Sequence, residues 1–301
     1  MSTEPQQVAV PTIAPPVKTA RIRAGLWRFI TKQPVGAAGL FMVLLIILMA
    51  VFAPLIQRYE LNDQDYTRRF QGPGLEHFMG TDNFGRDLWA RIVGGSRISV
   101  QVGFIAVFTG STLGLVLGVI SGYIGGSTDN FLQRLTEIML AFPGLLLALA
   151  LMATLGSGVD KVIIAISVGY IPRTLRVMRG TVLSTKENVY VDAARAIGAT
   201  PVRVMARHIL PNVMAPYLII ATSLLSTAIL AEATLSFLGL GVPPPHPSWG
   251  RMLSGAVAEY AVTAPWLVIF PGLAITWLVL GFNLFGDALR DVWDPRLRGS
   301  Q

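Results

Sequence analysis

The side chains that could do chemistry in this sequence are few and far apart. It contains no cysteine, so neither a disulfide nor a thiolate nucleophile is available. Its three histidines, His77, His208 and His246, are widely separated along the chain. No HExxH, GxSxG or GxxxxGKS/T motif occurs, so the sequence offers no zinc site, no serine nucleophile and no phosphate-binding loop. These absences predict a non-catalytic protein that binds no cofactor and no metal of its own.

One pair of acids, Asp82 and Asp87, lies close enough in sequence to raise the question of a metal site. No histidine is local to this pair, and Arg86 competes for the carboxylates, so the sequence argues against a metal. Glycine, aspartate and asparagine favour a compact turn here instead. An apolar stripe at helical spacing follows over 88–93 and predicts a short helix that lies on the external surface of the membrane. The residues of this external motif are Gly80, Thr81, Asp82, Gly85, Arg86 and Asp87.

Glu232 is the one ionisable residue well inside an apolar run. Ion-coupled carriers usually place several acids or histidines at mid-membrane, so this isolation argues against an ion-coupled secondary transporter, the alternative function. The lack of a nucleophile, a base or metal ligands in the apolar runs argues in the same way against a membrane enzyme. Two roles stay open for Glu232: structural pairing, and a part in a transport pathway or its gating. Because no motif in the chain supplies energy, active transport through this protein would need an energy-supplying subunit on another chain.

The composition indicates a membrane protein. The chain has 301 residues, of which 52% are hydrophobic and 14% charged, and its mean hydropathy is +0.58. Soluble domains carry roughly 25% charged residues. The formal net charge of +7 is therefore interpreted through the positive-inside rule and not as a sign of nucleic-acid binding.

The elements that must position these residues are membrane spans. A spanning helix needs about 20 apolar residues, and enough such runs occur to predict an all-α polytopic membrane protein with six transmembrane helices. The runs lie near 35–56, 98–121, 135–155, 159–178, 213–238 and 264–286.

The distribution of basic residues predicts the orientation of these spans. With the N-terminus in the cytoplasm, sixteen of the 24 Lys and Arg residues fall on cytoplasmic segments, so both termini are expected inside. A short charged cytoplasmic helix, broken before Pro295, is expected at the end. The expected parts are a partly disordered tail (1–33), a transmembrane domain (34–287) and a C-terminal tail (288–301), with an external loop at 57–97 and a cytoplasmic loop at 180–212.

The second apolar run carries glycines at steps of four, which leave one side of a helix nearly bare. Backbones can approach closely there, as membrane helices do where lipid removes the hydrophobic drive. Tight packing within one subunit is one interpretation, and a subunit interface or a pathway lining is the other. The glycines are Gly110, Gly114, Gly118 and Gly122.

The loops carry three smaller predictions. Arg134 and Glu137 are three residues apart on a helix and can pair. Trp249, in a proline-rich external loop, is expected to anchor at the membrane interface. His246 in the same loop is expected to be solvated and not a ligand.

The polar, basic stretch from Ser184 to Asn212 carries helix signals although it lies between two spans. Ser184 and Glu187 have the spacing of a capping box, and Gly198 suits the position just past a helix end. Thr200 and Pro201 then fit the N-cap and first position of a second helix. Pro211 is expected to end that helix. A helix–turn–helix in this position predicts an element that docks onto another protein.

The same stretch resembles a known family motif. Asp192-Ala193-Ala194, then Gly198 after three residues, followed by Ile209-Leu210-Pro211, is similar to the "EAA" loop of permease subunits of bacterial ABC importers. Two positions depart from that motif. Asp192 replaces the usual Glu, with the same charge on a shorter side chain, and His208 stands where an Ile is usual.

Further segments narrow the resemblance. The external motif at 80–87, the run at 235–241, Trp249-Gly250 and the segment 282–295 resemble the dipeptide/oligopeptide/nickel importer group, and within it the C-type permease. The similarity covers residues 20–298.

The resemblance implies a type I permease fold in the bacterial cytoplasmic membrane and a set of partner subunits. These are a homologous second permease in a heterodimer, two ATPase subunits that carry ATP and Mg, and an extracytoplasmic solute-binding protein. Peptides are the implied substrates, with glutathione, nickel chelates and opine-like compounds left open. The basic residues of the loop would contact an acidic rim of the ATPase or merely follow the positive-inside rule. The implied coupling residues are Asp192, Ala193, Ala194, Arg195, Ile197, Gly198, Pro201, Arg203, Arg207, His208 and Pro211.

Overall fold

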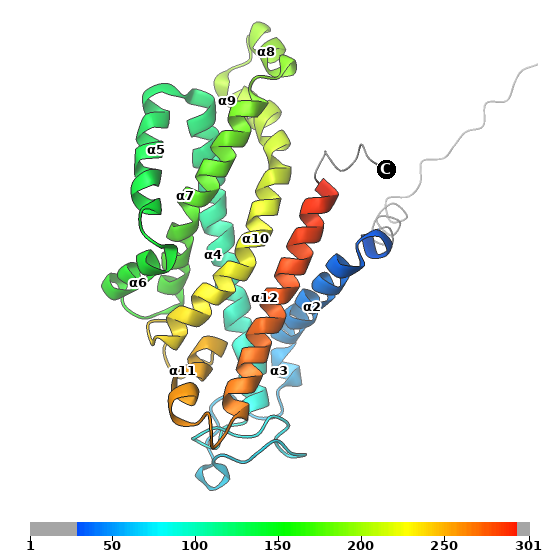
Figure 1. Ribbon diagram of the computed structural model, residues 1–301, viewed down its shortest axis with the longest axis vertical. Coiled ribbons are helices and arrows are strands. Elements are labelled where there is room, and N and C mark those ends of the chain that lie inside the picture. The colour runs from blue at the N-terminus through cyan, green and yellow to red at the C-terminus, as the bar shows by residue number, and fades with distance from the viewer. Residues whose placement is uncertain (1–28, 294–301) are drawn as a thin grey trace, which may run out of the picture.

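The computed structural model describes residues 29–293, and the rest of the two predicted tails lies outside this range. The described residues form long helices, with one isolated β-bridge between Thr81 and Asp87 as their only extended pairing (Figure 1). The elements are α2 (Pro34–Val51), α3 (Ala53–Ile56), η1 (Tyr66–Arg68), α4 (Leu88–Ile124), α5 (Gly126–Leu140), α6 (Gly144–Leu155), α7 (Val159–Thr185), α8 (Val189–Ala196), α9 (Pro201–Val204), η2 (Met205–Ile209), α10 (Leu210–Phe237), α11 (Trp249–Glu259) and α12 (Trp266–Trp293).

Four helical stretches of the described chain are long and apolar enough to cross a membrane: α2, α4, the continuous stretch Pro201–Phe237, and α12. The expected third span is bent, because α5 and α6 meet at 88°, and together they would make a fifth crossing. The expected fourth span corresponds to α7, whose 27 residues give a length of about 40 Å. The charges of Arg173, Arg176 and Arg179 lower its hydropathy.

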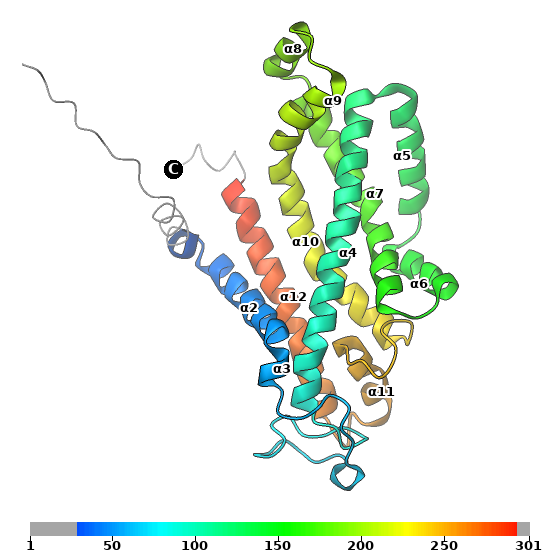
Figure 2. The same ribbon diagram turned by 180° about the vertical axis from the view of Figure 1, so that it is seen from behind.

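The glycine stripe of α4 faces α7 of the same chain. A Cβ added at Gly114 would lie 2.7 Å from the Ile171 carbonyl oxygen, and one added at Gly118 would lie 2.7 Å from Cβ of Met178. Gly110 and Gly122 likewise approach the α7 backbone too closely to leave room for a Cβ. As a result α4 and α7 make the most extensive contact between two elements, and they run side by side in both ribbon views (Figures 1 and 2).

The apolar core lies where α4, α7, α10 and α12 meet. It includes Val102, Leu224, Ile229 and Leu278, each at most 1% exposed. Trp249 belongs to this core as well, since it is fully buried and its Nε1 donates to the Ile92 carbonyl oxygen at 3.0 Å. The expected interfacial anchor is therefore wrong: the indole packs inward and its one donor is satisfied by a helix backbone.

Several local predictions of helix boundaries are also wrong. Leu88–Val93 are the buried first turns of α4 and not a separate surface helix. Ser184 lies inside α7, which runs to Thr185, so no capping box forms there. Pro211 does not end a helix: the helical stretch is continuous over Pro201–Phe237, and the π-helical turn η2, with its wider i→i+5 hydrogen bonding, lies immediately before Leu210 and Pro211. The predicted separate helix after the last span is the continuous end of α12.

Candidate functional site

The stretch that resembles a coupling loop forms two short helices at one end of the bundle (Figure 1). Asn188 precedes α8, and α8 ends in a turn through Gly198, whose φ is +84°. That left-handed conformation is strained for residues with a Cβ, so the predicted role of Gly198 in the turn agrees with its backbone. The Thr200 side chain accepts a hydrogen bond from the Arg203 N–H at 3.4 Å with Pro201 in the first turn, as predicted for the start of α9.

The two short helices bury one face and expose the other. Val191 and Val204 are fully buried against the ends of α4, α7 and α10, and Ala194 is 5% exposed. In contrast, Ile197 is 86% exposed and Val202 70%. The apolar members of the implied coupling residues are therefore divided: Ala194 packs the loop onto its own chain, and Ile197 with the exposed Ala193 faces outward.

The polar residues of the loop lie around this exposed apolar tip. Asp192 pairs with Arg195 at 3.2 Å, and the Arg195 guanidinium lies 5.3 Å from the centre of the Tyr123 ring at the end of α4. Pro211 is exposed at the start of α10. A hollow of about 440 Å³ between the two helices is lined by Ala194, Ile197, Ala199, Arg203, Arg207 and His208.

An ion pair that sequence reasoning missed holds the base of this loop. Arg179 of α7 donates from Nε and Nη2 to the two carboxylate oxygens of Asp129, each at 2.6 Å. Ser121 Oγ donates to the same carboxylate at 2.5 Å, and Lys186 Nζ donates to the Gly122 carbonyl oxygen at 3.0 Å. No short sequence pattern predicts this pair, because Asp129 and Arg179 are 50 residues apart in the chain.

Glu232 is fully buried in α10, where serine hydroxyls satisfy its carboxyl group. Ser99 of α4 donates to Oε2 at 3.0 Å, and Ser236 donates to Oε1 at 2.8 Å. The Val242 N–H in turn donates to the Ser236 hydroxyl at 3.3 Å. Among the described residues, no cation lies within ion-pair distance of Glu232, so the carboxyl connects α4, α10 and the following loop through hydrogen bonds.

The external motif forms a closed polar turn at the opposite end of the bundle. Asp82 accepts backbone hydrogen bonds from Phe84 and Arg86 at 2.8 and 3.0 Å, and its second oxygen lies 2.7 Å from Arg86 Nε. Gly80 and Gly85 have φ of +80° and +74°, and the Thr81 hydroxyl accepts from the Gln71 N–H at 2.9 Å.

The expectation that no histidine is local to this motif is wrong. His77 Nδ1 lies 2.8 Å from Asp87 Oδ2, and both side chains are buried. The other oxygen of Asp87 caps α4 by accepting from the Ala90 N–H at 2.7 Å. No group of three or more candidate metal ligands occurs in the part of the chain that the structure describes.

Two of the smaller loop predictions agree with the structure. Arg134 and Glu137 pair at 3.2 Å on the surface of α5, and His246 is exposed.

An apolar hollow of about 350 Å³ lies between α6, α7 and α10. Its lining includes Leu145, Ile166 and Leu230, and its polar groups include the Tyr170 hydroxyl, which donates to Thr227 at 3.2 Å. The apolar lining and the few polar groups are typical of small-molecule sites.

Comparison with known proteins places this architecture in a family. Residues 114–299 match the family model described as "Binding-protein-dependent transport system inner membrane component", and residues 24–73 match "N-terminal TM domain of oligopeptide transport permease C". A putative peptide transport system permease protein of Brucella suis is 46% identical over 86% of this chain and 87% of its own length.

Other relatives and one solved structure agree with this assignment. A dipeptide transport system permease protein of Alkalihalophilus pseudofirmus is 43% identical over 95% of both chains, and a glutathione transport system permease protein of Escherichia coli O157:H7 is 40% identical over 97% of both. A chain of an inward-facing MetNI methionine ABC transporter has a TM-score of 0.52 and 19% identity, and covers 67% of this chain and 97% of its own. This solved structure supports the predicted all-helical importer fold, and by family match and sequence identity the chain belongs to the multi-pass inner-membrane permeases of binding-protein-dependent ABC transport systems.

Proposed function

We propose that this permease forms one half of the translocation pathway of an ATP-driven importer of di- and oligopeptides. The segment 180–212 would couple it to two ATPase subunits, with ATP and Mg on those partners. A homologous second permease would complete the pathway, and an extracytoplasmic solute-binding protein would deliver the substrate.

The exposed apolar tip of α8 and α9 carries this proposal. Val189, Ile197 and Val202 are 83%, 86% and 70% exposed, in a stretch that projects beyond the long helices (Figures 1 and 2). Burying one such side chain contributes about 1.5–3 kcal/mol, so a partner that covers all three gains substantially from contact. The basic hollow beside Arg203 and Arg207 suits an acidic rim on that partner.

The orientation is part of the proposal. The coupling loop, the start of α2 and the end of α12 lie toward one end of the bundle, and the external motif lies at the other (Figure 1). The positive-inside rule assigns the first of these ends, with both termini, to the cytoplasm. The ATPase subunits would then bind on the cytoplasmic side and the solute-binding protein on the other.

The apolar hollow between α6, α7 and α10 supports a role in the pathway. Small residues such as Gly144, Ala165 and Ala231 leave space there, and Thr227 and Tyr170 supply polar groups. We expect the second permease to close this hollow from its open side. Short peptides are the proposed substrates because the relatives are named for peptide, dipeptide and glutathione transport; glutathione is the second choice.

Reconstitution tests the proposal directly. The complete complex in proteoliposomes is expected to take up a labelled dipeptide only with binding protein outside and ATP on the ATPase side. An ion gradient alone is expected to drive none. Uptake by this chain under a gradient without any ATPase would overturn the proposal.

A substitution at the apolar tip tests the coupling role. Ile197→Asp places a charge in the proposed contact and is expected to release the ATPase subunits and abolish uptake. Leu75→Asp, at a residue 92% exposed in the external loop, is the matched control and is expected to retain both. Normal ATPase binding by the Ile197→Asp complex would contradict the coupling role.

A further inference from the structure

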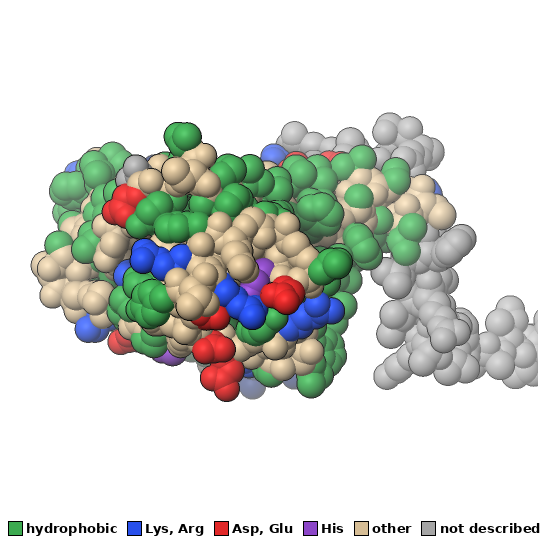
Figure 3. All heavy atoms as spheres, turned by 90° about the horizontal axis from the view of Figure 1, so that it is seen from below, with side chains coloured by type: hydrophobic (Ala, Val, Ile, Leu, Met, Phe, Trp, Pro, Cys, Tyr) green, Lys and Arg blue, Asp and Glu red, His purple; other side chains and the backbone are tan. Residues whose placement is uncertain are grey.

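A cavity of about 400 Å³ opens at the end of the bundle away from the coupling loop. The external motif, the first turns of α4, the proline-rich loop and α11 surround it. Figure 3 views this end of the molecule, where basic and acidic side chains lie close to one another. Its volume lies within the range of about 300–1,000 Å³ that small-molecule sites occupy.

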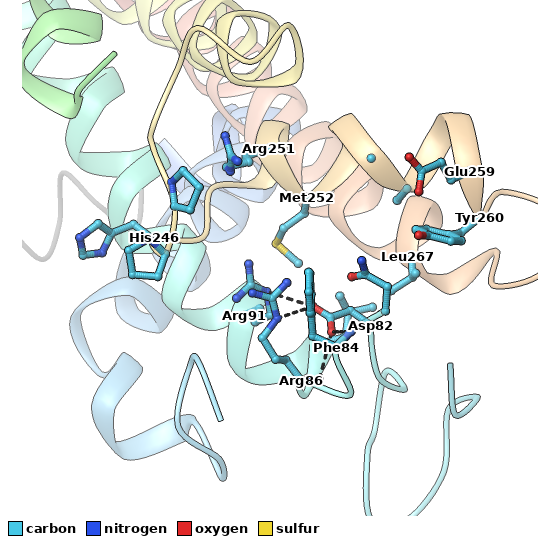
Figure 4. Close-up of a pocket in the computed structure, with 16 residues that line it drawn as sticks. Asp82, Phe84, Arg86, Arg91, His246, Arg251, Met252, Glu259, Tyr260 and Leu267 are labelled. Carbon is cyan, nitrogen blue, oxygen red and sulfur yellow. Dashed lines mark hydrogen bonds and ion pairs between the residues drawn. The ribbon is translucent and has the colours of Figure 1, made fainter. Parts of the chain in front are cut away.

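One wall of the cavity carries an excess of positive charge. Arg86, Arg91 and Arg251 line it together (Figure 4), and Asp82 is the acid on their side. Asp82 lies 2.7 Å from Arg86 Nε and 3.7 Å from Arg91 Nε. Arg251 has no acidic partner within ion-pair distance among residues 29–293, and the contact of its Nη1 with the Val242 carbonyl oxygen is long, at 3.5 Å.

Because Arg91 is buried, solvent screens the positive charge of this wall only weakly. Arg91 is 7% exposed, and its Nη1 donates to the Leu61 carbonyl oxygen at 3.1 Å. A buried guanidinium that shares a single carboxylate with a second arginine attracts a further anion strongly, because few water dipoles surround it. Guanidinium groups bind carboxylates with two parallel hydrogen bonds. A carboxylate is therefore the ligand group that this wall fits best.

The opposite wall carries the complementary charge. Glu259 is exposed at the end of α11 and has no basic partner within ion-pair distance in the described chain. Tyr260 lies beside it (Figure 4), and Asn83 lines the same cavity. Glu259 and Tyr260 line the same part of the cavity, and the neighbouring Glu259 carboxylate raises the pKa of Tyr260. An ammonium group would satisfy this wall, and Met252, Leu88 and Leu267 line the cavity with apolar surface.

The separation of the two walls sets the length of the ligand. Arg251 and Glu259 are eight residues apart on α11, which corresponds to about 12 Å along the helix axis. An extended chain covers about 3.3–3.6 Å per residue. About three residues therefore span the distance, and the long Arg and Glu side chains accommodate one residue fewer or more.

We propose that this cavity is a binding site for a short free peptide, with its terminal carboxylate on Arg251 and Arg91 and its terminal ammonium on Glu259. The inference rests on the proposed function, since a peptide importer is what would bring such a ligand to this face. An acidic side chain of the binding protein would match only the arginine wall and leave Glu259 without a cationic partner, so a zwitterion fits the cavity better.

Equilibrium dialysis of labelled trialanine against the complete permease–ATPase complex, without binding protein, tests this inference. Saturable retention is expected for the wild type. The Arg251→Gln complex and the trialanine amide are each expected to lower affinity about tenfold or more, since each loses the charge-assisted pair. Glu259→Gln is expected to weaken trialanine but not N-acetyl-trialanine. Arg97→Gln, at an exposed arginine of α4 outside the cavity, is the matched control and should bind as the wild type does.

Two results would overturn the inference: no trialanine retention by the wild-type complex, or retention that Arg251→Gln does not change. If Arg251→Gln retains trialanine but no longer associates with the binding protein, the arginine wall is a contact for that protein instead. ATP-driven uptake by the wild-type complex tests the proposed function separately. Uptake is expected even if the cavity binds no peptide, so the two proposals can fail independently.

Discussion

Arg179 forms a bidentate ion pair with Asp129, with Nε–Oδ1 and Nη2–Oδ2 distances of 2.6 Å. This pair ties α7 to the first turn of α5, a few residues before α7 gives way to the coupling loop. It is largely shielded from solvent, since the two side chains are 31% and 14% exposed. A rigid connection at this point would transmit a displacement of the coupling loop to the turn between α4 and α5.

Breaking the pair should therefore uncouple the loop from the bundle. Asp129→Asn and Arg179→Ala are each expected to cost about 1.5–3 kcal/mol, the range for hydrogen bonds to charged groups, and to lower ATP-driven uptake. The double exchange Asp129→Arg with Arg179→Asp should restore part of both. Thermal unfolding and uptake by the reconstituted complex measure the two effects.

The surface pair Arg134–Glu137 is the matched control. Its side chains are 82% and 53% exposed, so Arg134→Gln should change stability by less than about 1 kcal/mol. Equal losses in Arg134→Gln and Arg179→Ala would argue against a special role for the Asp129 pair.

The α4–α7 contact should tolerate no side chain on the glycine stripe. Gly118→Ala would place Cβ 2.7 Å from Cβ of Met178, and overpacking of this kind costs about 1–3 kcal/mol. The unfolding temperature of the purified complex is expected to fall. Gly180→Ala, on α7 with no atom within 4 Å of an added Cβ, should leave it unchanged or slightly raised. A Gly118→Ala complex as stable as Gly180→Ala would contradict the close packing.

Gly198 should be needed because its backbone is left-handed, and not because its side chain is small. An added Cβ there meets no atom within 4 Å, but φ is +84°. Gly198→Val is expected to cost about 1–2 kcal/mol locally and to tilt α9, with membrane insertion intact and substrate-stimulated ATPase activity lost. Gly198→Asn should retain most activity, because Asn visits the left-handed region more readily. Full stimulation of ATPase in the Val variant would refute the docking role.

Glu232 should act through its hydrogen bonds and not through a change of charge. Glu232→Gln keeps a side chain of the same shape that can pair with Ser99 and Ser236, and it is expected to keep stability and uptake. Glu232→Leu leaves both buried hydroxyls without this partner, at about 1–3 kcal/mol for each unsatisfied group. A Gln variant that assembles and unfolds like the wild type but transports nothing would instead assign Glu232 to gating.

The class of protein and the local geometry of the loop that resembles a coupling element were both predictable from the amino-acid sequence. Apolar runs longer than about 20 residues have few solutions other than spanning helices. The turn at Gly198 and the cap at Thr200 depend on residues within one turn of each other, and such short-range rules are readable along the chain. The family resemblance likewise depended on contiguous motifs.

Tertiary structure decided which residues meet. Glu232 and Ser99 are 133 residues apart, and Arg179 and Asp129 are 50 apart. His77 and Asp87 meet because the external loop folds back on itself, and Arg251 joins Arg91 because α11 packs beside α4. Packing also overrode the local helix signals at Ser184 and Pro211 and the interfacial position expected for Trp249. Hydropathy and capping rules describe a residue and its near neighbours, whereas burial, ion pairing and cavities depend on which helices lie side by side in space.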